Sequence, residues 1–305
     1  MFAFVSVTSV PSPVSVVVSL DSNINHRDWR GHRGHTRDGG FVPLWLYEIS
    51  SLRAALLIVG FVEAISLIGL FLARRFLVPR FHYSEGVNDA ISGTVQAIGV
   101  FYGITVGLIA VAVWNTNSSS SDLVSKEAAS IGALYRDVNG YPEPLRSELG
   151  TKLRNYTVFI IEQSWPAQQK GEILNGSTNI LNDFQSELYS FEPKTPGQVA
   201  LHGETLRSYN NLLENRRLRI DAVRSGLSGV MWAVIWAGAV ISIGVAYFFK
   251  IEDAKLHASL VALMGGFLGI VLFMITINDK PFYGYVTISS DPYKLILERV
   301  IDVTK

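Results

Sequence analysis

The stretch from Ile91 to Trp114 limits the possible fold more than any other part of the sequence. Its 24 residues carry no charge, and as a helix they are long enough to cross a hydrocarbon core about 30 Å thick. Gly99, Gly103 and Gly107 recur at every fourth position and therefore share one face of that helix. Small residues repeated in this way let helices approach closely in lipid. We therefore expect the central helix of a membrane bundle, rather than a buried helix of a large soluble protein.

The composition indicates the same class of protein. Charged residues make up 17% of the 305 residues, compared with about 25% in a typical soluble protein. The deficit is concentrated in four apolar segments, which are residues 52–73, 91–114, 227–249 and 258–278. The last segment carries a second glycine-rich face suited to helix packing, formed by Gly265, Gly266 and Gly269. The sequence therefore predicts an all-α membrane protein with four transmembrane helices.

A charged region without a membrane span separates the second and third segments. Apolar residues recur there at helical spacing in four runs, at 122–138, 143–165, 177–191 and 196–225. We therefore predict a soluble helical bundle over residues 115–225. The polar run at 115–121 is either a flexible joint or a helical extension of the preceding span, and we favour the extension. Residues 226–278 hold the last two spans. Residues 279–305 are expected to form an extended segment (284–289), followed by an amphipathic helix that begins near Asp291 and Pro292.

The first membrane region, residues 45–114, follows an unusual N-terminal stretch. Residues 1–44 form a disordered tail or an extension that is not translated, with synthesis starting for example at Val42. His26, His32 and His35 invite a metal-cluster interpretation, but in a polar stretch rich in Gly and Arg a disordered tail is the better one.

Glu63 lies near the middle of the first span. An acid at that depth is costly unless it faces protein or water. It is either an ion or proton site, or a protonated carboxyl that is hydrogen-bonded within the bundle, and we favour the second interpretation.

Four basic residues precede the third span: Arg216, Arg217, Arg219 and Arg224. Such a cluster can bind an anion or a phospholipid headgroup. The alternative, which we favour, is a solvated helix face whose arginines pair with acids such as Glu214 and Asp221. Glu127 and Arg136 are expected to form a structural salt bridge.

Several functions are disfavoured. The 26 basic and 26 acidic residues balance, so nothing indicates a nucleic-acid partner. The absence of cysteine excludes disulfides and thiolate chemistry. His82, His202 and His257 are isolated, and no phosphate-binding loop, nucleophile elbow or zinc-protease motif occurs. We therefore expect no enzyme activity, no metal and no cofactor.

Four features resemble a bacterial family of membrane proteins with bestrophin-like domains. They are KEAASIGALYRDV (126–138), Trp165, NRRLRI (215–220) and DKPFYGYVTIS (279–289). The order of two spans, a helical insertion and two more spans is also similar to that of bestrophins, which are pentameric anion channels. The resemblance covers nearly everything from Trp45 onward.

The resemblance implies a pore lined by the second membrane helix. Candidate lining residues lie on the face opposite its glycines: Thr94, Phe101, Thr105 and Leu108. The reverse orientation, with the glycines toward the pore, stays open. An acidic cluster of the kind that binds calcium in bestrophins is not evident in this sequence, so calcium gating is not expected.

The leading hypothesis is an oligomeric anion channel of the bacterial inner membrane, with lipid, further copies of the chain and small anions as partners. We place the helical bundle on the cytoplasmic side. The alternative is a membrane-anchored structural or signalling protein whose bundle binds a partner, and a transporter motivated by Glu63 is a third option.

Overall fold

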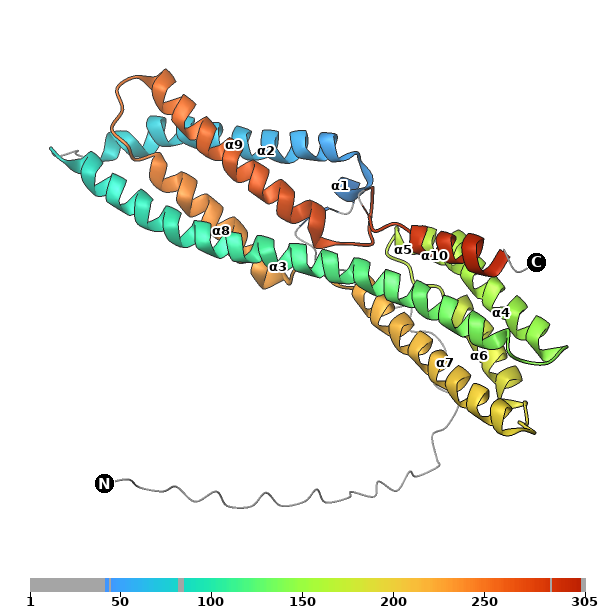
Figure 1. The fold of residues 1–305 in the computed structure, drawn as a ribbon. Helices are drawn as coiled ribbons and strands as arrows, with labels where there is room; N and C mark the ends of the chain where they lie inside the picture. Colours follow the sequence, from blue (N-terminus) through green and yellow to red (C-terminus); the bar gives the residue numbers. More distant parts are fainter. Residues whose placement is uncertain (1–41, 44, 82–84, 286, 303–305) are drawn as a thin grey trace, which may run out of the picture. The chain divides into compact units, whose positions relative to one another are not determined.

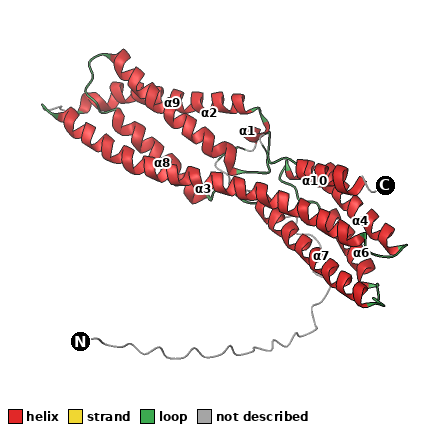
Figure 2. Cartoon of the chain, in the orientation of Figure 1, coloured by secondary structure: helices red, strands yellow, loops and turns green. Residues whose placement is uncertain are grey.

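The computed structural model describes residues 42–302, except for 44, 82–84 and 286. The four histidines at 26, 32, 35 and 82 and the proposed N-terminal tail up to residue 41 lie outside these residues. The described part is built from helices and connecting loops (Figures 1 and 2). The α-helices are α1 (Trp45–Glu48), α2 (Ser51–Leu72), α3 (Val87–Val138), α4 (Leu145–Phe159), α5 (Trp165–Gln168), α6 (Gly176–Tyr189), α7 (Pro196–Val223), α8 (Gly229–Ala246), α9 (Ala254–Asp279) and α10 (Asp291–Ile296).

Four short helical turns of other kinds extend these elements. Three are π-helical, at Ala73–Leu77, Ile160–Ser164 and Leu297–Ile301, and one is a 3₁₀ turn at Val78–Arg80. The second run of the bundle was expected to end at residue 165, which would leave Pro166 outside the helix. Instead it lies inside α5, because the wider π turn just before it accommodates the missing proline N–H.

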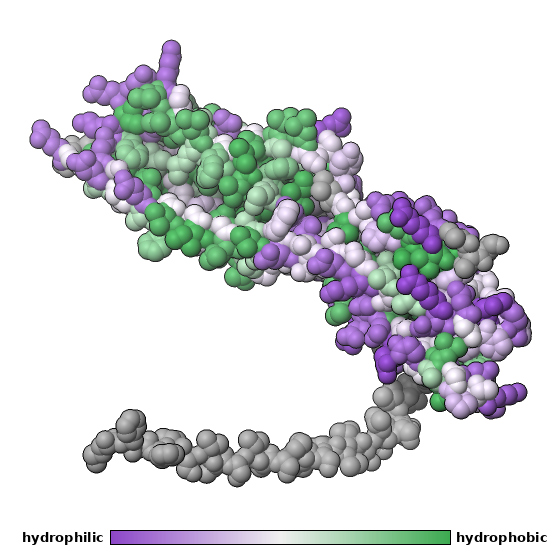
Figure 3. Space-filling view, in the orientation of Figure 1, coloured by the Kyte–Doolittle hydropathy of each residue, from purple (hydrophilic) through white to green (hydrophobic). Residues whose placement is uncertain are grey.

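Among the described residues, four helices are long and apolar enough to cross a membrane: Ser51–Arg80, Val87–Val138, Gly229–Ala246 and Ala254–Asp279. This confirms the expected all-α membrane fold with four spans. On the face shown in Figure 3, apolar residues dominate the surface around α2, α8 and α9, and hydrophilic residues dominate around the bundle. A chain with these two surfaces needs two solvents, hydrocarbon for the first part and water for the second.

The helix α3 belongs to both parts. It runs for 52 residues without a break, which at 1.5 Å per residue is about 78 Å, and Figure 1 shows it passing from the span helices into the bundle. The polar run at 115–121 is therefore a helical extension, as expected. Thr116 and Ser120 donate their hydroxyl protons to the carbonyl oxygens four residues earlier, at 3.0 and 2.8 Å. These bonds satisfy the hydroxyl groups within the helix itself.

Within one chain the central span is α9, and not α3 as we expected. α9 contacts α2, α3 and α8, whereas the membrane half of α3 packs mainly on α8 and α9. Gly265 and Gly269 bring α9 close to α2. A Cβ atom at Gly265 would lie 2.8 Å from the Ser66 hydroxyl oxygen, and one at Gly269 would lie 2.9 Å from the Cα atom of Val59. The glycine face of α9 thus brings its backbone against α2.

The second half of α3 is the axis of the soluble bundle. It packs along α7 and also contacts α4 and α10. α4 packs on α6, and the buried core runs from Val124 through Leu153 and Phe184 to Leu212. The segment after α9 closes this core, because Phe282, Tyr293 and Ile301 are buried in it. The C-terminal helix therefore docks on the bundle.

We predict that Gly269→Ala destabilises the chain and that Gly266→Ala does not. A methyl group at Gly269 meets the α2 backbone, which cannot yield as a side chain can, so we expect a loss of about 1–3 kcal/mol. A Cβ at Gly266 has no neighbour within 4 Å, so that control should stay within about 1 kcal/mol of wild type. Thermal unfolding in detergent measures both, and equal midpoints for the two variants would contradict the α2–α9 contact.

Candidate functional site

The membrane half of α3 buries only one narrow stripe within the chain. Val106, Ile109 and Val113 are buried, and they belong to the core formed with α8 and α9. Tyr102 lies half-buried on the same side and donates its hydroxyl proton to the carbonyl oxygen of Ile235 at 3.0 Å. The remaining circumference of this helix has no partner in the described part of the chain.

The candidate lining residues Thr94, Phe101, Thr105 and Leu108 all lie on this exposed circumference. Phe101 is 73% exposed and Leu108 is 68% exposed. The two threonines donate their hydroxyl protons to the carbonyl oxygens of Ala90 and Phe101, at 2.9 and 2.8 Å. The face therefore presents methyl groups, a ring and an isobutyl group, with its polar hydrogens already used.

Gly99, Gly103 and Gly107 are also exposed. A Cβ at any of the three would have no neighbour within 4 Å. We expected them to pack against neighbouring helices, and within one chain they do not, because α8 and α9 occupy the adjacent stripe instead. Any packing role of these glycines needs another copy of the chain.

Glu63 lies half-buried on α2, beside the α9 backbone. The Cβ position of Gly265 is 3.7 Å from its Cα atom. Among the described residues no hydrogen bond or ion pair to its carboxyl group is found. The hydrogen-bonded carboxyl that we favoured is therefore not formed within one chain.

The four arginines before the third span do not form one cluster. Arg219 is buried, Arg216 donates to the hydroxyl oxygens of Ser177 and Thr178 at 2.9 and 2.8 Å, and Arg217 lies 4.0 Å from Asp221 in an exposed pair. The guanidinium of Arg224 has no hydrogen bond or ion pair within the described residues. The expected solvated face is correct for Arg217 and wrong for Arg219.

Arg219 instead forms a buried ion pair with Glu127, at the centre of the bundle. The side chains are 1% and 0% exposed. The Arg219 Nε donates to Glu127 Oε2, and its Nη1 donates to Gln168 Oε1 at 2.9 Å. The guanidinium also lies 5.9 Å from the ring centroid of Trp165. Glu127 thus pairs with α7, and not with Arg136 as the sequence led us to expect, because Arg136 is exposed.

Two tyrosines complete the coordination of Glu127. The hydroxyl of Tyr156 donates to Oε1 at 2.7 Å, and the hydroxyl of Tyr293 donates to Oε2 at 3.1 Å. Burial raises the pKa of both phenols well above the usual value, and the negative charge of Glu127 adds to it. Both tyrosines therefore stay neutral donors. This network joins α3, α4, α5, α7 and α10.

Charge compensation keeps the buried arginine ionised. Burial lowers the pKa of the Arg219 guanidinium, but the charge and hydrogen bond of Glu127, together with Tyr293 and Tyr156, outweigh burial, and the pKa lies above its usual value. Each member of this pair lies in a sequence run that we singled out, KEAASIGALYRDV or NRRLRI. The runs showed where to look, but only the fold shows that the two side chains meet.

A second polar contact joins the ends of the spans. Asp279, at the end of α9, is 5% exposed and accepts from the backbone N–H of Leu227, just before α8. The side chains of Tyr47 and Trp232 lie beside the same carboxylate. Burial raises the pKa of Tyr47 above its usual value, and the charge of Asp279 adds to it. One carboxylate thus ties together α1, α8 and α9.

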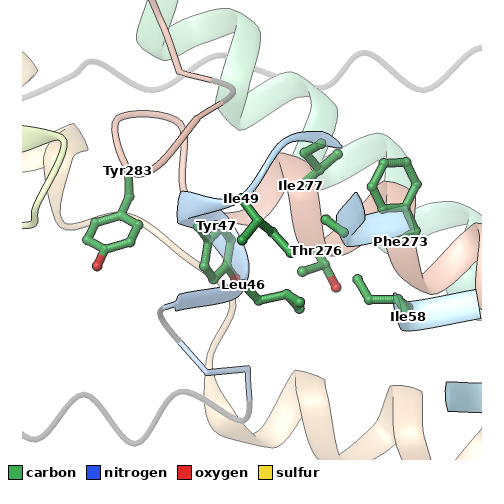
Figure 4. Close-up of a pocket in the computed structure, with 9 residues that line it drawn as sticks. Leu46, Tyr47, Ile49, Ile58, Phe273, Thr276, Ile277 and Tyr283 are labelled. Carbon is green, nitrogen blue, oxygen red and sulfur yellow. The ribbon is translucent and has the colours of Figure 1, made fainter. Parts of the chain in front are cut away.

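The loop after α9 crosses α1 closely at this junction. The N–H of Tyr285 donates to the carbonyl oxygen of Tyr47 at 2.7 Å. Gly284 has φ +87°, and a Cβ there would overlap the same carbonyl, so only glycine fits. Nearby, Leu46, Thr276 and other residues line a cavity of about 20 Å³ (Figure 4), which has room for about one water molecule.

Within the described residues no group of three or more His, Asp or Glu side chains is placed to hold a metal ion. His257 is buried and lies 3.0 Å from the carbonyl oxygen of Ala246 and 3.3 Å from Arg74. His202 lies 2.8 Å from the hydroxyl of Tyr141. Both imidazoles therefore take part in contacts within the fold.

We predict that the ion pair at the centre of the bundle is strongly coupled. Glu127→Gln leaves Arg219 buried without a counter-charge, and Arg219→Met leaves Glu127 without its cation, so each should cost about 3–5 kcal/mol. The double variant should cost much less than the sum. The free energies of unfolding in detergent test this, with Arg217→Gln as an exposed control expected within about 0.5 kcal/mol of wild type. Additive losses would show that the two charges do not act together.

The geometry defines a helical membrane protein with four spans and a helical bundle between the second and third. A family model described as the bestrophin-like domain matches residues 60–293. The chain therefore belongs to the bestrophin-like family. No curated protein matches it.

Solved structures agree on the fold. A variant of a bacterial bestrophin homologue from Klebsiella pneumoniae aligns with a TM-score of 0.59 and 10% identity, covering 84% of this chain and 99% of that one. A second variant of this homologue aligns with a TM-score of 0.58 and 9% identity, covering 81% and 98%. A further structure, described as a membrane protein, gives 0.58 and 10%, covering 84% and 99%.

Proposed function

We propose that several copies of this chain assemble in a membrane as an anion channel, with α3 lining its neck. The proposal places Thr94, Phe101, Thr105 and Leu108 toward the channel axis. It is supported by membership of the bestrophin-like family and by the exposure of this face in a single chain. The proposed surroundings are a bacterial inner membrane with the bundle on the cytoplasmic side.

The physical basis is a neck that controls conduction by its wetting. A ring of apolar side chains disfavours a continuous water column, so ions pass only when the neck is filled. Phe101 and Leu108 supply such groups, and the threonines keep their hydroxyl protons within α3. No charge has to be buried in the neck, which suits weakly hydrated anions that shed water readily.

The observation that carries the proposal is the polar continuation of α3 beyond Trp114. From residue 115 to 119 most side chains are exposed amides or hydroxyls. Such residues suit a water-filled vestibule and would be costly against lipid tails. Along one unbroken helix, the exposed face changes from apolar to polar. This change is expected where an apolar neck opens into a water-filled vestibule.

We predict that Phe101→Ala raises anion flux several-fold, because it shortens the apolar barrier. The matched control is Phe267→Ala on α9, where the ring is 65% exposed and lies outside the proposed neck. Halide influx into liposomes loaded with a dye whose fluorescence is quenched by halide measures both variants. A monomeric protein without flux would instead favour a membrane anchor whose bundle binds a partner.

We also predict that Glu63→Gln leaves halide flux unchanged, because α2 does not line the proposed neck. The measurement is halide flux with and without a pH gradient across the liposome membrane. If wild-type flux follows the pH gradient and the variant loses this dependence, the protein is a proton-coupled transporter and the channel proposal is wrong.

A further inference from the structure

The turn between α7 and α8 forms a pocket against α3, separate from the buried ion pair and next to the junction at Asp279 described above. Its volume is about 360 Å³. It is lined by Ala112, Val113, Thr116, Arg224, Ser225, Gly226, Leu227, Met231 and Asp279. The pocket therefore lies where the apolar half of α3 gives way to its polar continuation.

The pocket shares a side of α3 with the proposed neck. Leu108, Ala112 and Thr116 follow one another at intervals of four residues, so they lie on one face of the helix. An ion that moves along this face from the bundle toward Leu108 passes the pocket first.

Arg224 gives the pocket a free positive charge. The other three arginines before the third span are held by hydroxyls or carboxylates, whereas the Arg224 guanidinium has no partner among the described residues. The acid in the same pocket, Asp279, is 5% exposed and accepts from the backbone N–H of Leu227. Little of its carboxylate therefore opens onto the pocket.

The backbone adds to this positive field. In the described part of the chain the N–H of Gly226 has no acceptor. α8, an 18-residue helix, begins at Gly229, so the positive end of its dipole lies at the same turn. Val113, Leu227 and Met231 supply an apolar wall that favours an ion with weakly held water.

We propose that this pocket binds a small, weakly hydrated monovalent anion, such as chloride or bromide, held by Arg224 and the Gly226 N–H at the bundle-side mouth of the neck. The inference rests on the proposed channel for its role, but the pocket itself can be tested without flux. Its volume corresponds to on the order of ten waters, so the ion keeps part of its hydration shell. A lipid phosphate has the same donor requirements, and the test must separate the two.

The test is bromide binding to the full-length protein in a phosphate-free sugar detergent. Binding is measured as the excess line width of the bromide NMR signal. Arg224→Gln should weaken binding by about tenfold, since a charged hydrogen bond is lost. Arg224→Lys, which keeps the charge, should retain part of the binding. Arg217→Gln is the matched control, because Arg217 is an exposed arginine on α7 that lies outside the pocket. Equal thermal midpoints show that the variants are folded.

Bromide broadening that is the same in Arg224→Gln and in wild type overturns the site. Native mass spectrometry in the presence of phosphatidylglycerol supplies the second arm. Lipid retained by wild type and lost in Arg224→Gln, with bromide binding unaffected, assigns the pocket to a headgroup and also overturns the inference. If the protein shows no flux but binds bromide in a way that depends on Arg224, the site is supported and only the channel proposal is contradicted.

Discussion

The buried pair of Glu127 and Arg219 is the interaction on which the rest of the bundle depends. Taking both ions out of water costs several kcal/mol, and the structure offsets that cost with two tyrosine hydroxyls, a glutamine and a tryptophan ring. Glu127 belongs to α3, whose first half is the second span. Arg219 belongs to α7, which leads toward the third span. A pair that fixes these two helices fixes how the bundle meets the membrane. Asp279 has the matching role at the membrane surface, where it joins the ends of three elements.

The two solvents of the chain explain where it leaves surface unpaired. In water, α3 buries a broad face against α4, α7 and α10, because apolar burial drives packing there. In lipid, apolar side chains need no such cover, and helices associate through close backbone contact. α9 uses its glycines for that purpose against α2. α3 instead leaves exposed both its glycines and the face that carries Phe101. This difference between the two glycine-bearing helices favours contacts between α3 and further copies of the chain.

The sequence predicted the elements better than their contacts. Long apolar stretches with almost no charge identified the four spans, and the helical extension through residues 115–121 followed from the strongly helical residues after it. Contacts between distant residues were harder. A lone Glu127 gave no sign that its partner lay 92 positions away. A run of four arginines looked uniform, although Arg219 is buried and Arg224 is exposed. The apolar periodicity of the run at 196–225 missed Arg219, because a buried charge breaks the pattern that identifies a core. We expected α3 to be the central span, but within one chain it is α9. Glycine spacing predicts that a helix packs closely, but it does not show whether the neighbouring helix belongs to the same chain or to another copy.

The account as a whole claims that copies of this chain are arranged around α3. A cryo-EM structure of the full-length protein in lipid nanodiscs tests this most directly. The account predicts a ring of copies in which the α3 helices lie nearest the axis, with Phe101 directed toward it and the bundles on one side of the membrane. A single copy, or a ring in which α3 faces the acyl chains at the outer edge, would contradict it.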